Sequence, residues 1–125
     1  MSKADCMEKT PPVPTEIRLA KSKDFLTVSF DSGDQFDLSA EYLRVFSPSA
    51  EVQGHSPDQR KLQYGKSGVL IMGVEPVGNY AVRLEYTDGH KTGLYTWVYL
   101  HKLGSEYEEL WDEYLGELEQ SGYSR

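Results

Sequence analysis

The side chains best suited to chemistry in this chain are three histidines, His55, His90 and His101, and one cysteine, Cys6. An imidazole near neutral pH binds metal ions or moves protons, and a thiolate acts as a nucleophile or a metal ligand. No i, i+4 or H-x-x-x-H spacing connects the histidines, and none begins the H-x-D or H-x-E pair of the facial triad in non-haem iron oxygenases. The spacing therefore indicates surface or hydrogen-bonded histidines and does not predict a catalytic metal centre.

The sequence also lacks the patterns that activate a nucleophile or hold a phosphate group. Cys6 lies among polar residues near the N-terminus, and no serine stands in a G-x-S-x-G elbow. Gly65-Lys66-Ser67-Gly68 resembles the end of a phosphate-binding loop, but Arg60 occupies the position of the first glycine that such a loop requires. We interpret this segment as a turn, and we predict that the chain is not an enzyme.

The charge distribution restricts the classes of partner. The formal net charge is −7, and residues 105–120 carry seven acidic side chains and no Lys or Arg. Because phosphate contacts need clustered basic side chains, we do not expect nucleic-acid binding. The longest uncharged apolar run, residues 68–74, is far shorter than the ~20 residues that a membrane span needs, and the N-terminus has no apolar signal region. We therefore expect a cytoplasmic protein without a membrane partner.

The length and the prolines define the domain organisation. A chain of 125 residues fits one domain with a single core. Pro11, Pro12 and Pro14 fix φ and remove backbone donors in a polar segment. We predict a disordered arm over residues 1–14, one domain over residues 15–120 and a tail over residues 121–125.

The alternation of apolar and polar residues predicts the strands that would position the histidines. The predicted strands span residues 17–19, 26–30, 35–38, 80–84 and 90–95. Asp88-Gly89 is a strong hairpin signal before the last of these strands. Residues 69–72 are apolar without alternation, which predicts burial on both faces. Residues 51–67 are expected to form a long surface loop.

Helices are predicted at two places in the chain. Ser39 is expected to cap a short helix near residues 39–46, with Leu43 and Phe46 facing the core. A C-terminal amphipathic helix follows from apolar positions at i, i+3, i+4, i+7, i+8 and i+11. These positions are Tyr107, Leu110, Trp111, Tyr114, Leu115 and Leu118. Ser105 and Glu108 fit a capping box for it, whereas residues 96–103 are ambiguous between helix and strand. Together these elements predict a small α+β domain with a mostly antiparallel sheet.

Several ordered motifs resemble one known family. They are Pro14-Thr15-Glu16-Ile17, Leu43-Arg44 before Ser47-Pro48-Ser49-Ala50-Glu51, Gly54-His55, Gly78-Asn79-Tyr80-Ala81-Val82, Asp88-Gly89-His90, and Gly93-Leu94-Tyr95-Thr96-Trp97. This string resembles the gamma-butyrobetaine hydroxylase-like N-terminal domains, formerly a domain of unknown function. The resemblance implies a compact α+β fold. In the relatives an L-R-x-x-C-x-C-x-x-C run and a later histidine hold a structural zinc ion.

The zinc ligands of those relatives are mostly absent from this chain. The resemblance places the ligand positions at Ser47, Ser49, Val52 and His90, and it implies that His90 approaches the serine loop. A serine hydroxyl does not ionise near pH 7, and valine cannot bind a metal ion, so we predict no bound cofactor. We expect Ser47 and Ser49 to form hydrogen bonds with the local backbone around Pro48 instead.

The resemblance leaves three interpretations of function. Relatives of this domain stand alone, precede an iron- and 2-oxoglutarate-dependent oxygenase, or join iron–sulfur carrier proteins. The favoured interpretation is a non-catalytic module that binds a protein partner, linked to iron–sulfur or metal metabolism, through a surface of Arg44, His55, His90, Tyr95 and Trp97. The alternatives are an iron- or zinc-binding domain that uses His90, His55 and carboxylates, and an accessory subunit that assembles in trans with an oxygenase. The first is favoured because it requires no ligand that the sequence lacks.

Overall fold

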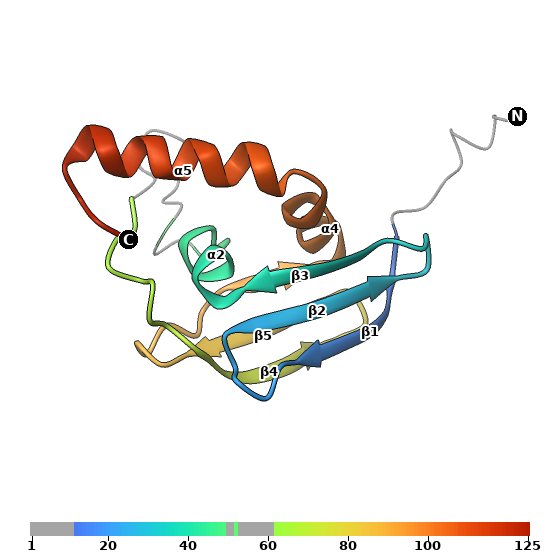
Figure 1. Ribbon diagram of the computed structural model, residues 1–125. Helices are drawn as coiled ribbons and strands as arrows, with labels where there is room; N and C mark the ends of the chain where they lie inside the picture. Colours follow the sequence, from blue (N-terminus) through green and yellow to red (C-terminus); the bar gives the residue numbers. More distant parts are fainter. Residues whose placement is uncertain (1–11, 50–51, 53–61) are drawn as a thin grey trace, which may run out of the picture.

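Two three-stranded antiparallel sheets and three helices form the part of the protein that the computed structural model describes, residues 12–49, 52 and 62–125 (Figure 1). The first sheet contains β1 (Pro14–Leu19), β2 (Phe25–Phe30) and β3 (Gln35–Ser39), and the second contains β4 (Ile71–Val77), β5 (Ala81–Tyr86) and β6 (Leu94–Thr96). The helices are α2 (Ala40–Val45), α4 (Trp97–Ser105) and α5 (Tyr107–Ser121). This arrangement confirms the predicted α+β class.

The first sheet follows the alternation in the sequence. Leu26, Val28 and Phe30 of β2 are buried, and Leu26 pairs with Leu38 of β3. The turn between β2 and β3 places Gly33 at φ 96°, a conformation that favours glycine. β1 begins at Pro14, so the strand takes in the last residue of the predicted arm. Val13 of that arm is also bonded to Asp31, and residues 1–11 lie outside the described residues.

Helix α2 forms where the cap was predicted. The backbone amide of Tyr42 donates a 3.0 Å hydrogen bond to the Ser39 hydroxyl, which satisfies a free donor of the first turn. All six residues of α2 are buried, including Glu41 and Arg44. Leu43 and Phe46 contact the core as expected. A helix this deeply buried makes its own polar side chains part of the interior.

The second sheet differs from the prediction in three places. Met72 is 51% exposed, so residues 69–72 are not buried on both faces, because only one face of β4 packs on the core. Tyr80 is 50% exposed and precedes β5, because the β4–β5 turn extends to it. The strand expected at residues 90–95 is reduced to β6, because residues 90–93 contact the loop after α2 instead of extending the ladder.

The C-terminal half of the fold is helical. Residues 97–105 form α4, whose first turn is capped by the Thr96 hydroxyl, so the ambiguity there resolves to helix. α5 forms as predicted, but the expected capping box is absent, because Ser105 is the last residue of α4 and its hydroxyl bonds back to the Lys102 carbonyl. None of the described helices is long and apolar enough to cross a membrane.

The tail after α5 folds back onto the domain. Gly122 ends α5 at φ 77°, and the Tyr123 ring stacks on Tyr64 at a centroid distance of 4.1 Å. The Arg125 guanidinium donates two hydrogen bonds, of 3.0 and 2.7 Å, to the buried Glu41 carboxylate of α2. The tail therefore supplies the counter-charge for an acidic side chain of the interior. Most of the loop predicted at residues 51–67 lies outside the described residues.

Candidate functional site

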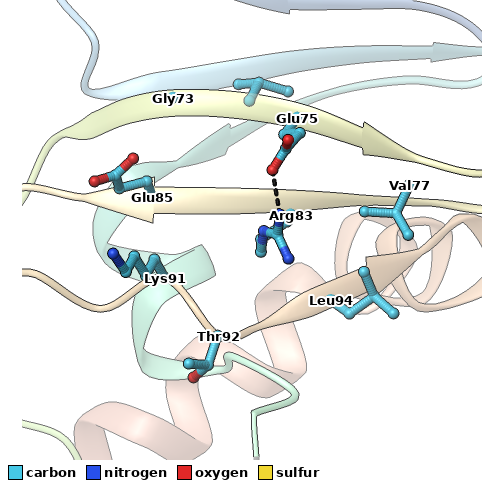
Figure 2. A pocket seen from close by; sticks show the side chains of 9 residues that line it. Gly73, Glu75, Val77, Arg83, Glu85, Lys91, Thr92 and Leu94 are labelled. Atoms are coloured by element: carbon cyan, nitrogen blue, oxygen red, sulfur yellow. Dashed lines mark hydrogen bonds and ion pairs between the residues drawn. The ribbon is translucent and has the colours of Figure 1, made fainter.

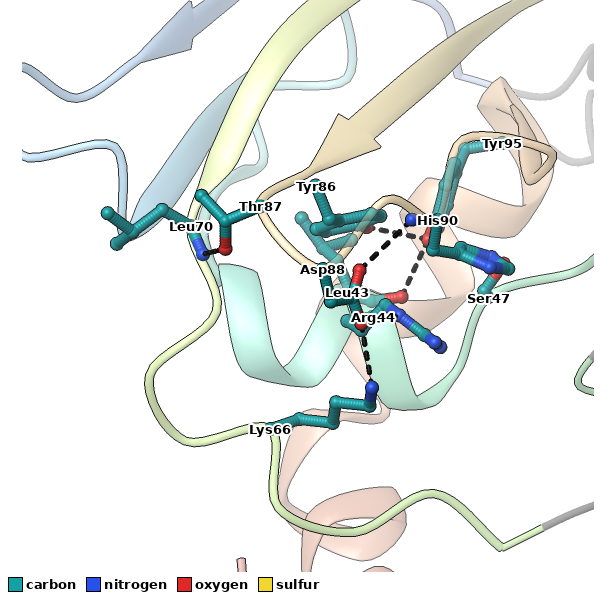
Figure 3. A network of polar contacts seen from close by, with 10 residues as sticks. All are labelled: Leu43, Arg44, Ser47, Lys66, Leu70, Tyr86, Thr87, Asp88, His90 and Tyr95. Carbon is teal, nitrogen blue, oxygen red and sulfur yellow. Dashed lines mark hydrogen bonds and ion pairs between the residues drawn. The ribbon is translucent and has the colours of Figure 1, made fainter.

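The four positions that hold zinc in relatives, Ser47, Ser49, Val52 and His90, are called the former knuckle, and a buried hydrogen bond connects Ser47 to His90. Ser47 follows α2, and His90 follows the turn after β5, where Gly89 adopts φ 91°. The Ser47 hydroxyl lies 2.9 Å from Nε2 of His90, and both residues are buried (Figure 3). The approach of His90 to the serine loop, which the family resemblance implied, is confirmed.

Further contacts fill the loop after α2. The Ser49 amide donates a 3.2 Å hydrogen bond to the Ser47 hydroxyl, and the Ser49 and Thr92 hydroxyls lie 2.6 Å apart. The Val52 amide donates to the Ser49 carbonyl, and the Val52 side chain is buried. A Cβ atom at position 93 would overlap the Ser47 hydroxyl, so glycine is required there. The predicted hydrogen bond to the local backbone is present for Ser47, whereas the Ser49 hydroxyl contacts the side chain of Thr92.

The donor atoms of this loop do not fit a structural zinc ion. Zinc in proteins takes thiolate, imidazole or carboxylate ligands, and Ser47, Ser49 and Val52 supply none of these beside His90. Among the described residues, no group of three His, Cys, Asp or Glu side chains lies together as a metal site requires. His55 and Cys6, which the sequence offers as further ligands, lie outside the described residues.

A chelator should therefore leave the fold unchanged. We expect the thermal unfolding midpoint of the purified protein to be the same with and without a millimolar excess of EDTA. The side chains of the former knuckle do not form a zinc site, so the fold should not depend on a bound metal ion. Differential scanning calorimetry measures this midpoint. A fall of the midpoint that added zinc reverses would contradict the expectation.

Removal of the Ser47 hydroxyl should destabilise the domain. Ser47→Ala removes the buried hydroxyl that contacts Nε2 of His90 and accepts from the Ser49 amide, and loss of such a buried hydrogen-bonding group costs about 1–3 kcal/mol. Urea denaturation of the variant measures the loss. Ser32→Ala, which removes an exposed hydroxyl that donates to Asp34, is the control and should change stability by less than about 0.5 kcal/mol. Equal stability of the two variants would show that the buried bond contributes little.

An ion-pair cluster lies beside this loop. Nε of Arg44 donates to Oδ2 of Asp88 at 2.9 Å, and Nζ of Lys66 donates to the same oxygen at 2.7 Å (Figure 3). The second Asp88 oxygen accepts from the His90 amide at 3.1 Å. Burial alone would raise the pKa of Asp88, but the bonds from Lys66, the His90 amide and Arg44 outweigh it and lower the pKa to about 2. Asp88 therefore stays ionised and ties α2 to the β5–β6 connection.

This lowered pKa predicts an acid-sensitive contribution to stability. A carboxylate whose pKa is lower in the folded state stabilises the fold above its unfolded pKa of 3.8, and the contribution is lost as the pH falls toward 2. We expect the difference in unfolding free energy between the natural protein and Asp88→Asn to shrink between pH 5 and pH 2. Urea denaturation at several pH values measures it. A difference that stays constant over this range would exclude the proposed ion pairs as its source.

Two buried tyrosines complete the polar interior of the site. The Tyr95 hydroxyl donates a 2.7 Å hydrogen bond to the Leu43 carbonyl of α2 and lies 2.7 Å from the Tyr86 hydroxyl. Burial raises the pKa of both tyrosines well above the ordinary value. They remain neutral donors that join β5 and β6 to α2.

The surface predicted from the sequence is therefore wrong for three of its five residues. Arg44 and His90 are each 7% exposed and Tyr95 is fully buried, because α2 and the residues after β5 pack against each other. His55 lies outside the described residues, and Trp97 is half-buried at the start of α4. The third histidine, His101, is separate from this site: Nε2 lies 2.8 Å from the Asp34 carboxylate, and the ring contacts Phe30 and Phe36 edge-on.

Trp97, which was predicted at the surface, forms an aromatic corner with Tyr80 and Val98, which the sequence did not indicate. Tyr80 is 50% exposed and Val98 is 57% exposed. The Trp97 amide donates a 3.0 Å hydrogen bond to the Tyr80 carbonyl, and the Trp97 indole donates to the Asn79 carbonyl at 2.8 Å. These bonds hold the start of α4 against the β4–β5 turn. The Gly78-Asn79 turn signal before Tyr80 could have indicated that Tyr80 lies outside the strand.

Close to this corner, the outward face of the second sheet contains a shallow hollow of about 920 Å³ (Figure 2). Its charged side chains come from adjacent strands, and Glu75 pairs with Arg83 across β4 and β5. The lining residues are Gly73, Val74, Glu75, Val77, Arg83, Glu85, Lys91, Thr92 and Leu94. The hollow is open and is lined by side chains of both charge signs.

Comparisons with known proteins agree with this architecture. One solution NMR structure matches with a TM-score of 0.80 at 48% identity, and the match covers 93% of this chain and 91% of that chain. A second solution NMR structure matches with a TM-score of 0.79 at 46% identity, over 94% of this chain and 88% of that chain. A crystal structure from Acidithiobacillus ferrooxidans, described as a DUF971-family protein of unknown function, matches with a TM-score of 0.62 at 38% identity over 74% of this chain and 93% of that one. The search of curated proteins gives no match. The family model described as "Gamma-butyrobetaine hydroxylase-like, N-terminal" matches residues 17–101. The chain therefore belongs to the gamma-butyrobetaine hydroxylase-like N-terminal domain family.

Proposed function

We propose that the chain is a non-catalytic accessory module that binds a protein partner through the aromatic corner. The observation that supports this proposal is that the polar side chains of the former knuckle lie in the interior, whereas aromatic and aliphatic side chains are exposed elsewhere. Ser47 and His90 of the former knuckle are buried and contact each other, and beside them the buried Arg44 donates through Nε to the partly exposed Asp88. Tyr80 and Val98 of the corner are exposed, whereas Trp97 is half-buried and packs partly against the core. Recognition by apolar contact therefore suits this molecule better than catalysis.

The composition of the aromatic corner supports partner binding. Tyrosine and tryptophan dominate the energetics of protein interfaces, because each combines a large apolar area with a polar group. Both hydrogen bonds of Trp97 go to backbone carbonyls of the β4–β5 turn, so its ring is held in one orientation before binding. A preoriented aromatic group loses less conformational entropy on binding. We infer a partner that presents an apolar surface to Tyr80, Trp97 and Val98.

The family setting indicates the class of partner. Relatives of this domain accompany iron–sulfur carrier proteins or an iron-dependent oxygenase, as the resemblance of the sequence implies. The donor set of the knuckle does not fit a metal ion, so this chain would act on such a partner by contact. We place the partner among proteins that handle iron or iron–sulfur clusters.

The test compares surface variants in cross-linking from the native cell. The natural protein, Tyr80→Ser/Val98→Ser and the control Tyr64→Ser/Tyr123→Ser are produced without an affinity tag and cross-linked in extract from the native cell. Cross-linked proteins and bound metals are then quantified on the same samples. The control removes two exposed tyrosines that stack on each other at the tail. We expect one iron-handling protein to be captured by the natural protein and the control, and at least ten times less by the corner variant.

Two outcomes would overturn the proposal. Equal capture by the corner variant and the control would show that the corner is not the binding surface. Stoichiometric iron or zinc in all three samples would favour the metal-binding alternative instead. Circular dichroism of each variant checks that the fold is kept.

A further inference from the structure

The geometry points to a binding site for a small oxyanion, a phosphate or carboxylate group, on Arg44 and Lys66. Arg44 is 7% exposed, and Nε is bonded to Asp88. Nη1 of the same guanidinium is buried and has no hydrogen-bond partner in the described part of the chain. A buried charged donor without an acceptor is costly, and such groups are rare in folded proteins. The free nitrogen therefore marks a position where an acceptor is missing.

The local charge favours an anion at this position. Arg44 and Lys66 share a single acceptor atom, Oδ2 of Asp88, so two positive charges lie around one carboxylate. The second Asp88 oxygen is occupied by the His90 amide. The tyrosine hydroxyls nearby are neutral, because burial raises the pKa of Tyr86 and Tyr95. The cluster keeps an excess positive charge in a chain whose net charge is −7.

The shape of the guanidinium selects oxyanions over other anions. Its planar nitrogens match the spacing of two oxygens on a carboxylate or a phosphate group, which gives bidentate hydrogen bonds. Figure 3 shows the end of the Arg44 side chain extending away from the Asp88 carboxylate. Lys66 is partly exposed, and its Nζ, which contacts the same Asp88 oxygen as Arg44, provides the second positive charge of the site. A spherical chloride ion cannot form the paired contact.

An NMR titration of the whole chain tests this site. Sodium phosphate, sodium acetate and sodium chloride are added to the ¹⁵N-labelled protein at constant ionic strength and pH 7. We expect saturable shifts of the Arg44 Nε–H signal and of the Arg44 and His90 amides with phosphate or acetate, and none that saturate with chloride. The stronger of phosphate and acetate identifies the group that the site prefers.

A matched pair of lysine variants separates the site from general charge effects. Lys66→Gln removes one cation of the cluster and should weaken oxyanion binding at least tenfold. Lys21→Gln removes the same charge from the exposed turn between β1 and β2, and it should leave binding unchanged. Equal weakening by both variants would overturn the site, as would linear shifts with all three salts. If Lys66→Gln does not fold, the titration of the natural protein with the three salts is the test of the oxyanion site. The aromatic corner is unchanged in these variants, so failure here does not affect the test of partner binding.

Discussion

Asp88→Ala is expected to lower the free energy of unfolding by about 3 kcal/mol, because it leaves the buried Arg44 charge without its carboxylate. Removal of the partner of a buried charge costs far more than loss of an exposed ion pair, since the buried Arg44 charge stays desolvated. Lys66 loses the same acceptor, and the His90 amide loses its bond to the side chain. Urea denaturation monitored by tryptophan fluorescence measures the change.

The control for this prediction is a surface ion pair in the same sheet. Glu75→Ala removes the carboxylate that pairs with Arg83 on the outward face, where both side chains are largely exposed. Exposed pairs contribute about 0–1 kcal/mol, so this variant should be nearly as stable as the natural protein. If Asp88→Ala were as mild as Glu75→Ala, the cluster at Arg44 would not be holding α2 in place.

Gly104→Ala is expected to destabilise the domain by about 2 kcal/mol, although alanine normally stabilises a helix. A Cβ atom at position 104 of α4 would overlap the ring of Phe36 on β3. The ring or the helix must move, and overpacking of this kind costs about 1–3 kcal/mol. Thermal unfolding of the variant measures the effect. The prediction depends on close contact between α4 and the first sheet.

A second helical glycine provides the matched control. Gly116 lies in α5 with open space around its Cα, so Gly116→Ala should raise stability by up to about 1 kcal/mol through helix propensity. Phe36→Leu should also relieve part of the cost of Gly104→Ala in a double variant, because the overlapping ring is gone. Stabilisation by both alanine substitutions would mean that α4 does not approach Phe36 as described.

The fold was predicted where local signals agree with tertiary packing. Alternation located β1, β2 and β3, and helical spacing located α5, because the apolar side chains of each element lie mainly on one face. The prediction of a strand at residues 90–95 was wrong for most of that range. Residues 90–93 contact the loop after α2, and such a tertiary contact cannot be read from alternation. The capping box failed because the sequence does not show that Ser105 ends a preceding helix.

The site was predicted less well than the fold. The resemblance correctly implied contact between His90 and the loop at Ser47, since the motif order carries that geometry. Arg44 and Tyr95 were assigned to the surface because a charged or hydroxyl-bearing side chain is usually exposed. Their burial depends on partners distant in the sequence, Asp88 and the Leu43 carbonyl, and a single sequence does not reveal such pairings.

The burial of α2 has a consequence for how the domain loses structure. Six residues are too few for a helix to persist alone in water, so α2 exists only while its surroundings hold it. Those surroundings include Asp88 after β5 and Arg125 at the end of the chain. Local opening of either segment therefore weakens the same short helix, and the amide protons of α2 should exchange with solvent in step with the whole molecule. The cooperativity of this small domain therefore depends on the packing around α2.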